Sequence, residues 1–306
     1  MMPIGYSFPN DRLTNEMLVK LYPEWTEEKI FAKTGIKSRY VVDENTTALD
    51  LATAAAENLF LDSGIKREEI DYLLLCTQSP EYRLPSTACI LHERLGLPKT
   101  AGALAFDHGC SGFIYGLSFA KGLVVGGMAK KVLLVTAETY TKYIADTDRA
   151  TRTIFGDGAA ATIIDVESAA KIGAFSFGTD GSGAEKLIVR DGRLFMDGPE
   201  IFNFTLDVVP KTMEAVLAKN GLAREDIDLY VFHQANKFML DAIRKVNGLP
   251  SEKFYINMET VGNTVSSTIP IALKQLEDAG RLTHGMKVML MGFGVGLSWG
   301  ATVITI

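Results

Sequence analysis

The feature that most constrains the fold is a regular alternation of short apolar runs with longer segments of helical pattern. The apolar runs lack polar alternation, which is typical of strands buried on both faces; they are residues 72–77, 131–138, 160–166, 229–234 and 287–294. The segments between them, such as "ALDLATAAAENLFLDSG", end at glycine, a common helix stop. This alternation predicts a layered α/β architecture with mostly parallel strands.

A second feature is an internal repeat, in which residues 63–78 align with residues 220–235. Both copies read as a helix end, a short acidic turn and a buried strand. A gene duplication would give two similar halves, residues 1–165 and 166–306, and a cleft between them could take catalytic groups from both. The alternative is that helix-to-strand connections converge on glycine and aspartate.

Composition excludes several classes of function. The net charge of the 306 residues is −6, so there is no general electrostatic attraction to nucleic acid or to anionic membranes. Three cysteines without a CxxC pair indicate reduced thiols, and the four histidines show no zinc-ligand spacing. The N-terminus does not resemble a signal peptide, and no apolar run has membrane-spanning length. We therefore expect a soluble cytoplasmic protein without a metal.

Cys110 is the residue that most strongly suggests covalent chemistry. It follows the strand-like run 102–106 and precedes a segment with apolar residues at helical spacing. At the N-terminus of a helix, free backbone N–H groups favour a thiolate and lower the pKa of a thiol. The flanking Gly109 and Gly112 allow a tight turn and close approach of a substrate. The alternative for any cysteine is a small buried hydrophobe, an interpretation that fits the two other cysteines, Cys76 and Cys89.

Three further positions could supply catalytic groups. His233 ends the strand-like run 229–233, where open α/β sheets place functional side chains, although a satisfied core histidine is the alternative. Gly262 and Asn263 precede small hydroxyl residues and an apolar helix, which by itself indicates a turn with a helix cap. Glycines on both sides of Val295 predict a tight turn between two strands, by itself no more than a hairpin.

Together, the motifs "GCSGF", "IFGDGAAATII", "HQAN", "GNT" and "GFGVGLSWG" occur in the order and spacing of the β-ketoacyl-acyl-carrier-protein synthase III family. The sequence resembles this family, part of the thiolase-like superfamily, over nearly its whole length. The resemblance implies an α/β thiolase-like fold, with two duplicated halves in a five-layer αβαβα arrangement. It also implies a homodimer.

The resemblance further implies a catalytic triad of Cys110, His233 and Asn263. Cys110 would attack the thioester of an acyl-CoA or acyl-carrier primer and hold its acyl group. His233 and Asn263 would hydrogen-bond the thioester oxygen of malonyl-acyl carrier protein and stabilise the enolate left by decarboxylation. The enolate would attack the acyl group, and the backbone N–H groups of Cys110 and Val295 would hold the second oxyanion. The β-ketoacyl product would serve fatty acid or related acyl-chain biosynthesis, and no cofactor is needed.

The sequence differs from the better-known coenzyme A-dependent members of the family at the positions that bind the adenine end of coenzyme A in those members. Lys29 and Lys33 replace a Trp and an Arg, and Trp25 lies four residues too early. Pro199 and Phe238 replace an Asn and an Arg. These differences predict weak affinity for coenzyme A and delivery of the primer by acyl carrier protein or another thioester.

Two groups of residues are expected to bind the substrates. The substrate-binding group comprises Lys33, Arg149, Phe202, Asn236, Leu84 and Phe293, of which the last two line either the cleft or the dimer contact. An acidic carrier protein would dock on a local basic rim, chiefly on Lys237 and Arg152. The rim comprises Lys33, Lys37, Arg39, Arg149, Arg152, Lys237, Arg244 and Lys245. Ordinary solvated surface charge is the alternative.

Other activities stay open at this point. An acyltransferase of the same fold would move the acyl group from Cys110 to an oxygen or nitrogen acceptor in a specialised pathway, and a non-decarboxylating condensation is another possibility. A thioesterase-like hydrolase and an idle partner subunit come from different classes, and the complete triad disfavours the idle subunit. Asn263 beside His233 favours decarboxylation.

Overall fold

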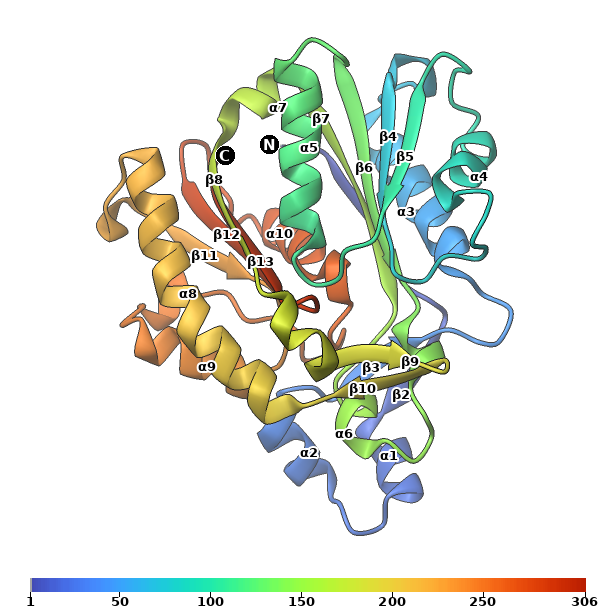
Figure 1. The fold of residues 1–306 in the computed structure, drawn as a ribbon, viewed down its shortest axis with the longest axis vertical. Coiled ribbons are helices and arrows are strands. Elements are labelled where there is room, and N and C mark those ends of the chain that lie inside the picture. The colour runs from blue at the N-terminus through green and yellow to red at the C-terminus, as the bar shows by residue number, and fades with distance from the viewer. Residues whose placement is uncertain (1) are drawn as a thin grey trace.

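The computed structural model describes residues 2–306 as two mixed β-sheets that helices enclose and separate (Figure 1). The first sheet has the order β1-β7-β6-β4-β5. Its strands are β1 (Ile4–Ser7), β4 (Tyr72–Cys76), β5 (Gly102–Phe106), β6 (Lys131–Glu138) and β7 (Gly158–Asp165). The second sheet has the order β11-β12-β13-β8. Its strands are β8 (Ile172–Thr179), β11 (Leu229–Phe232), β12 (Lys287–Gly294) and β13 (Ser298–Thr305).

The two sheets repeat one pattern of strand order and direction. In the first sheet, β1 pairs antiparallel with β7, β7 antiparallel with β6, and β6 parallel with β4. In the second, β8, β13, β12 and β11 follow in the same order and directions. The strands β4 and β11 carry the two copies of the sequence repeat, as a duplicated fold requires. The division of the chain at residue 165, the last residue of β7, stays a prediction.

Helices complete the five-layer αβαβα arrangement (Figure 1). The outer face of the first sheet is covered by α3 (Ala48–Ser63) and α4 (Thr87–Arg94), and the middle layer consists of α5 (Gly112–Val125) and α10 (Thr268–Asp278). The outer face of the second sheet is covered by α8 (Gly198–Asn220), with α9 (Lys237–Val246) beside it. A short helix, α7 (Val166–Lys171), connects the sheets.

The expectation of mostly parallel strands is wrong. Among the strands of residues 2–306, parallel pairing is confined to β4 with β5 and β6, and to β11 with β12. Residues 295–297 join β12 to β13, and so short a connection permits only an antiparallel pair. The hairpin predicted around Val295 is therefore confirmed.

The middle layer anchors the segments that carry the site. Ile114 and Leu117 of α5 and Ile269 and Leu273 of α10 are fully buried between the sheets. Burial of one such side chain contributes about 1.5–3 kcal/mol, so the first turns of both helices are held firmly. Within residues 2–306, no helix combines the length and apolar character that crossing a membrane requires.

Smaller elements form one end of the molecule (Figure 1). They are α1 (Asn15–Leu21), α2 (Glu27–Thr34), α6 (Arg149–Arg152), the pair β2 (Asp11–Thr14) with β3 (Ser38–Val41), and the pair β9 (Leu187–Arg190) with β10 (Arg193–Met196).

Arg39 on β3 corrects one expectation. The sequence predicts Arg39 on the basic rim, but its side chain is fully buried. It donates to the Leu13 and Thr153 carbonyls and to Oδ1 of Asn15. Burial lowers the pKa of Arg39 to about 10. The guanidinium thus connects the segment around Leu13 to the segment around Thr153, and it is not available to a partner protein.

Candidate active site

Cys110, His233 and Asn263 line one small cavity of about 110 Å³. Cys110 lies in the turn between β5 and α5 of the first half, whereas His233 directly follows β11 and Asn263 precedes α10 in the second. All three residues are buried. The other residues that line the cavity are mostly apolar: Ile154, Phe155, Leu187, Met196, Gly198, Ile201, Ala235, Asn236, Met239, Phe293 and Gly294. The structure thus brings together the three side chains that the sequence singled out.

The surroundings of Cys110 correct the predicted direction of its pKa. Its sulfur accepts hydrogen bonds from the backbone N–H groups of Cys110 itself and of Val295, and both bonds favour the thiolate. Burial in the apolar cavity outweighs them and, with the nearby charge of Glu138, raises the pKa of Cys110 to about 12. The helix N-terminus was expected to lower it. In the free protein Cys110 is therefore a neutral thiol.

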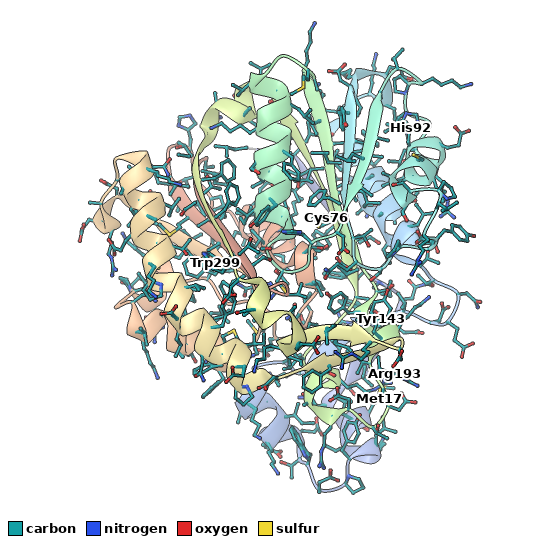
Figure 2. All side chains as sticks on the ribbon, in the orientation of Figure 1. Met17, Cys76, His92, Tyr143, Arg193 and Trp299 are labelled. Atoms are coloured by element: carbon teal, nitrogen blue, oxygen red, sulfur yellow. The ribbon has the colours of Figure 1, made fainter. Side chains whose placement is uncertain are left out.

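The two other cysteines differ from each other. Cys76 closes β4 in the interior (Figure 2), where its thiol donates to the His108 carbonyl at 3.0 Å, as expected of a buried cysteine. Cys89 is exposed on α4, so the interpretation of it as a buried hydrophobe is wrong. In α4 the buried residues Ala88 and Leu91 lie on the face that packs against the sheet. The helical period places Cys89 on the opposite face, which solvent contacts.

The hairpin β12–β13 brings Val295 to Cys110. The hydroxyl of Ser298 donates to the Val295 carbonyl at 2.8 Å, and its oxygen accepts from Ser111 at 2.7 Å. Since Ser111 adjoins Cys110, these bonds connect the hairpin of the second half to the cysteine turn of the first. The backbone N–H groups of Cys110 and Val295 are both directed at the Cys110 sulfur, and the role of this pair in holding an oxyanion stays a prediction.

Asn263 is oriented by a backbone bond. Its Oδ1 accepts the N–H of Val265 at 2.9 Å, which leaves the two N–H groups of its amide as the free donors. Val265 has φ +54°, a left-handed conformation that is strained for a β-branched residue. The surrounding segment must therefore hold Val265 in place, and it does so through buried hydroxyl groups of Ser266 and Ser267 that bond to β6.

His233 is a neutral imidazole in this cavity. Its Nδ1 lies 2.7 Å from Oγ1 of Thr268, and its ring packs edge-on against Phe293 at 5.7 Å between centroids. Burial lowers the pKa of His233 to about 3, although the Val265 carbonyl beside the ring favours the protonated form. At neutral pH the ring is therefore uncharged.

A buried polar cluster beside the cavity was missed by the sequence analysis. Glu138, the last residue of β6, accepts from the backbone N–H of Gln78 and from the hydroxyls of Ser79 and Ser266. Burial raises the pKa of Glu138 to about 8. Tyr140 donates to Oε1 of Gln78. An acidic residue at the end of an otherwise apolar strand was the available signal.

The predicted substrate-binding residues divide into two groups. Asn236 and Phe293 line the cavity, and Phe202 lies next to lining residue Ile201, stacked on Phe238 at 5.2 Å between centroids. The others are not among the lining residues. They are Leu84, which is 82% exposed, Lys33, whose ammonium lies 5.0 Å from the Trp25 ring, and Arg149, which pairs with Glu24.

The two principal docking residues both have acidic partners of their own. Arg152 pairs with Asp146 at 2.9 Å, and Lys237 pairs with Asp241 one turn along α9. A carrier protein would therefore have to compete with an existing carboxylate at each position. Within residues 2–306, no cluster of three or more His, Cys, Asp or Glu side chains could hold a metal ion.

Comparison with known proteins gives consistent similarities. Family models described as 3-oxoacyl-(acyl-carrier-protein) synthase III and as its C terminal match residues 106–181 and 217–306. A β-ketoacyl-(acyl-carrier-protein) synthase III of Clostridium perfringens is 37% identical over 321 residues, covering 99% of this chain and 98% of that relative. A crystal structure of a 3-oxoacyl-(acyl-carrier-protein) synthase III is 46% identical, with a TM-score of 0.97 over 99% of this chain and 98% of the other. A structure of a synthase III from Thermus thermophilus is 37% identical, with a TM-score of 0.92 and the same coverage.

Proposed function

We propose that this chain, which belongs to the β-ketoacyl-acyl-carrier-protein synthase III family, condenses an acyl primer held on Cys110 with malonyl-acyl carrier protein. Decarboxylation of the malonyl group drives the reaction, and the product is a β-ketoacyl thioester for fatty acid or related acyl-chain synthesis. The single observation that carries the proposal is the meeting of Cys110, His233 and Asn263 in one buried cavity.

Acylation begins from neutral groups. As the sulfur of Cys110 attacks the carbonyl carbon of the primer thioester, its proton passes to the free ring nitrogen of His233. The oxyanion that forms accepts the N–H groups of Cys110 and Val295, whose direction towards the sulfur is already set. The C–S bond to the carrier then breaks, and its thiolate departs. A high thiol pKa makes this proton transfer a requirement, since the thiolate is scarce in the free protein.

Condensation uses the second half of the site. The amide N–H of Asn263 and the newly protonated ring of His233 donate to the thioester oxygen of the malonyl group. Loss of CO₂ leaves an enolate on that oxygen, which these donors stabilise. The enolate carbon attacks the acyl carbonyl, the C–S bond to Cys110 breaks, and the proton on His233 returns to the sulfur. All protons are accounted for, and each side chain ends in its initial state.

Delivery of the primer involves the end of the molecule that carries α2. The ammonium groups of Lys29 and Lys33 lie 5.3 and 5.0 Å from the ring of Trp25, and Arg149 pairs with the adjacent Glu24. Trp25 is therefore an aromatic surface flanked by cations, although it lies at a different sequence position from the family tryptophan. This arrangement supports binding of a phosphorylated carrier, either coenzyme A or the prosthetic group of an acyl carrier protein.

A homodimer is part of the proposal. Strand β5 forms an edge of the first sheet, and unpaired edges are normally covered or blocked. Leu104 on this strand is 47% exposed, and Phe106 packs edge-on against the exposed Phe119 at 5.3 Å. A second copy of the chain that pairs with β5 would cover both the edge and these apolar side chains.

The test is a mass measurement of the intact protein. Incubation with acetyl and longer acyl groups, on coenzyme A and on acyl carrier protein, should give an adduct of one acyl group, which Cys110→Ala should lose. Addition of malonyl-acyl carrier protein should then remove the adduct with release of CO₂. An adduct that persists without CO₂ release would reject decarboxylating condensation and favour the acyltransferase alternative. Absence of any adduct would reject both activities.

A further inference from the structure

Thr268, the first residue of α10, contacts the catalytic histidine from the side away from the cavity. Its Oγ1 lies 2.7 Å from Nδ1 of His233 and 3.0 Å from the Val265 carbonyl. Thr268 is 3% exposed, so water does not compete for these bonds.

The two contacts have only one arrangement of hydrogens that satisfies both. A carbonyl oxygen can only accept, so the Thr268 hydroxyl must donate its single proton to Val265. The Thr268 oxygen is then an acceptor towards Nδ1, and Nδ1 must carry a hydrogen. The Val265 carbonyl, a second acceptor beside the ring, favours a ring N–H as well.

We infer that Thr268 is a positioning residue that keeps the hydrogen of neutral His233 on Nδ1, so that Nε2 presents a lone pair to the cavity. Nε2 has no hydrogen-bond partner within residues 2–306. It is therefore the ring nitrogen that takes the proton of Cys110 during acylation and returns it after condensation. This inference rests on the proposed function, since it assigns the atom through which His233 acts there.

The position of Thr268 depends on both halves of the chain. The neighbouring Ser266 donates to Glu138 at 3.1 Å, and Ser267 donates to the Thr136 carbonyl at 3.1 Å. Both acceptors lie on β6 of the first half. These bonds hold the strained Val265, whose carbonyl fixes the direction of the Thr268 hydroxyl. The first half of the chain thus supplies Cys110. Through these contacts it also helps to keep the hydrogen of His233 on Nδ1.

The direct test is ¹⁵N NMR of histidine-labelled protein at neutral pH, which distinguishes the two neutral forms of the ring. The chain has four histidines, so His233→Gln identifies the relevant signals by their loss. The wild type should show hydrogen on Nδ1. Thr268→Val, which keeps the shape and removes the hydroxyl, should move the hydrogen to Nε2 or give a mixture. Thr268→Ser keeps the hydroxyl and should match the wild type.

A kinetic measurement complements the spectrum. Thr268→Val should slow acylation of Cys110 by roughly 10- to 100-fold, less than the roughly 10²–10⁴-fold that complete loss of general acid–base catalysis costs, because His233 itself remains. Thr268→Ser should restore the rate to within a few-fold. Hydrogen on Nε2 in the wild type would overturn the inference, as would an unchanged ring form in Thr268→Val. If Thr268→Val does not fold, the wild-type spectrum still decides. Because the spectrum needs no substrate, it is independent of whether the proposed condensation occurs.

Discussion

Gly294 lies directly against the side chain of Cys110, so closely that a Cβ atom on Gly294 would lie 2.8 Å from Cβ and 2.9 Å from Sγ of the cysteine. Such contacts are too short for real atoms, so Gly294→Ala must displace Cys110 or the hairpin that carries Val295. We expect Gly294→Ala to reduce the rate of Cys110 acylation at least tenfold, as measured by intact mass over time.

Gly122→Ala is the matched control for that change. A Cβ atom at Gly122 would meet nothing within 4 Å, and the residue lies inside α5. Alanine there should preserve the acylation rate and raise the free energy of unfolding by up to about 1 kcal/mol. Equal acylation rates in Gly294→Ala and Gly122→Ala would contradict the close packing described here.

Asn263→Asp separates the structural bond of Asn263 from its proposed catalytic one. A carboxylate oxygen can still accept the Val265 N–H, but the amide N–H proposed to donate to the malonyl thioester is lost. We expect CO₂ release from malonyl-acyl carrier protein to fall roughly 10²–10³-fold, the usual cost of one oxyanion donor. Acylation of Cys110 should change much less. A parallel loss of both activities would argue against a role confined to the malonyl step.

His233 should make stability depend on pH in the acid range. Burial lowers the pKa of His233 to about 3, from about 6.5 in an unfolded chain, so below pH 6.5 the unfolded chain binds a proton that the folded protein excludes. The folded protein should therefore lose stability as pH falls, by roughly 2–4 kcal/mol between pH 7 and pH 4 from this group.

Urea unfolding of the wild type and His233→Gln at several pH values measures this effect. Glu138 and Asp157, whose pKa values burial raises to about 8 and about 6, act in the opposite direction but are present in both proteins. The difference between the two curves therefore isolates His233, and it should shrink as pH falls. Parallel curves would show that His233 titrates normally in the folded protein.

Carrier-protein docking on the basic rim predicts a charge-specific effect. Lys237→Glu and Arg152→Glu should each raise the KM for malonyl-acyl carrier protein up to about fivefold at low salt, and less at high salt. Lys211→Glu is a matched control, because Lys211 also pairs with an aspartate one turn away, on α8. If Lys211→Glu has the same effect, the loss reflects net charge rather than a docking site.

The edge of β5 predicts the oligomeric state. Leu104→Glu places a charge on the exposed apolar face of this strand and should convert a dimer into a monomer, as measured by light scattering coupled to gel filtration. Leu61→Glu, at an exposed leucine on α3, should leave the dimer intact. A wild type that is already monomeric would reject the proposed dimer.

Local sequence patterns predicted the elements beside the three candidate catalytic residues. The strand-like run before Cys110, the run before His233 and the glycines around Val295 each have a clear local signature, and the structure has the corresponding elements. The antiparallel direction of several strands was not predicted. Strand direction depends on the path of the connections between strands, which the residues of a single strand do not reveal.

What the local sequence could not predict depends on contacts between distant segments. The high pKa of Cys110 results from its burial and from Glu138, in a cavity lined by residues distant in sequence, such as Met196 and Phe293. The left-handed backbone of Val265 opposes its intrinsic preference and is held by hydroxyl bonds to β6. Arg39 is buried because distant carbonyls accept its hydrogens.

The neutral state of Cys110 between reactions also bears on its survival in an oxidising environment. Peroxides attack thiolates far faster than thiols, and exposed thiolates fastest of all. Because the Cys110 thiol stays protonated and is buried in a mostly apolar cavity, we expect it to form sulfenic acid more slowly than an exposed thiolate would.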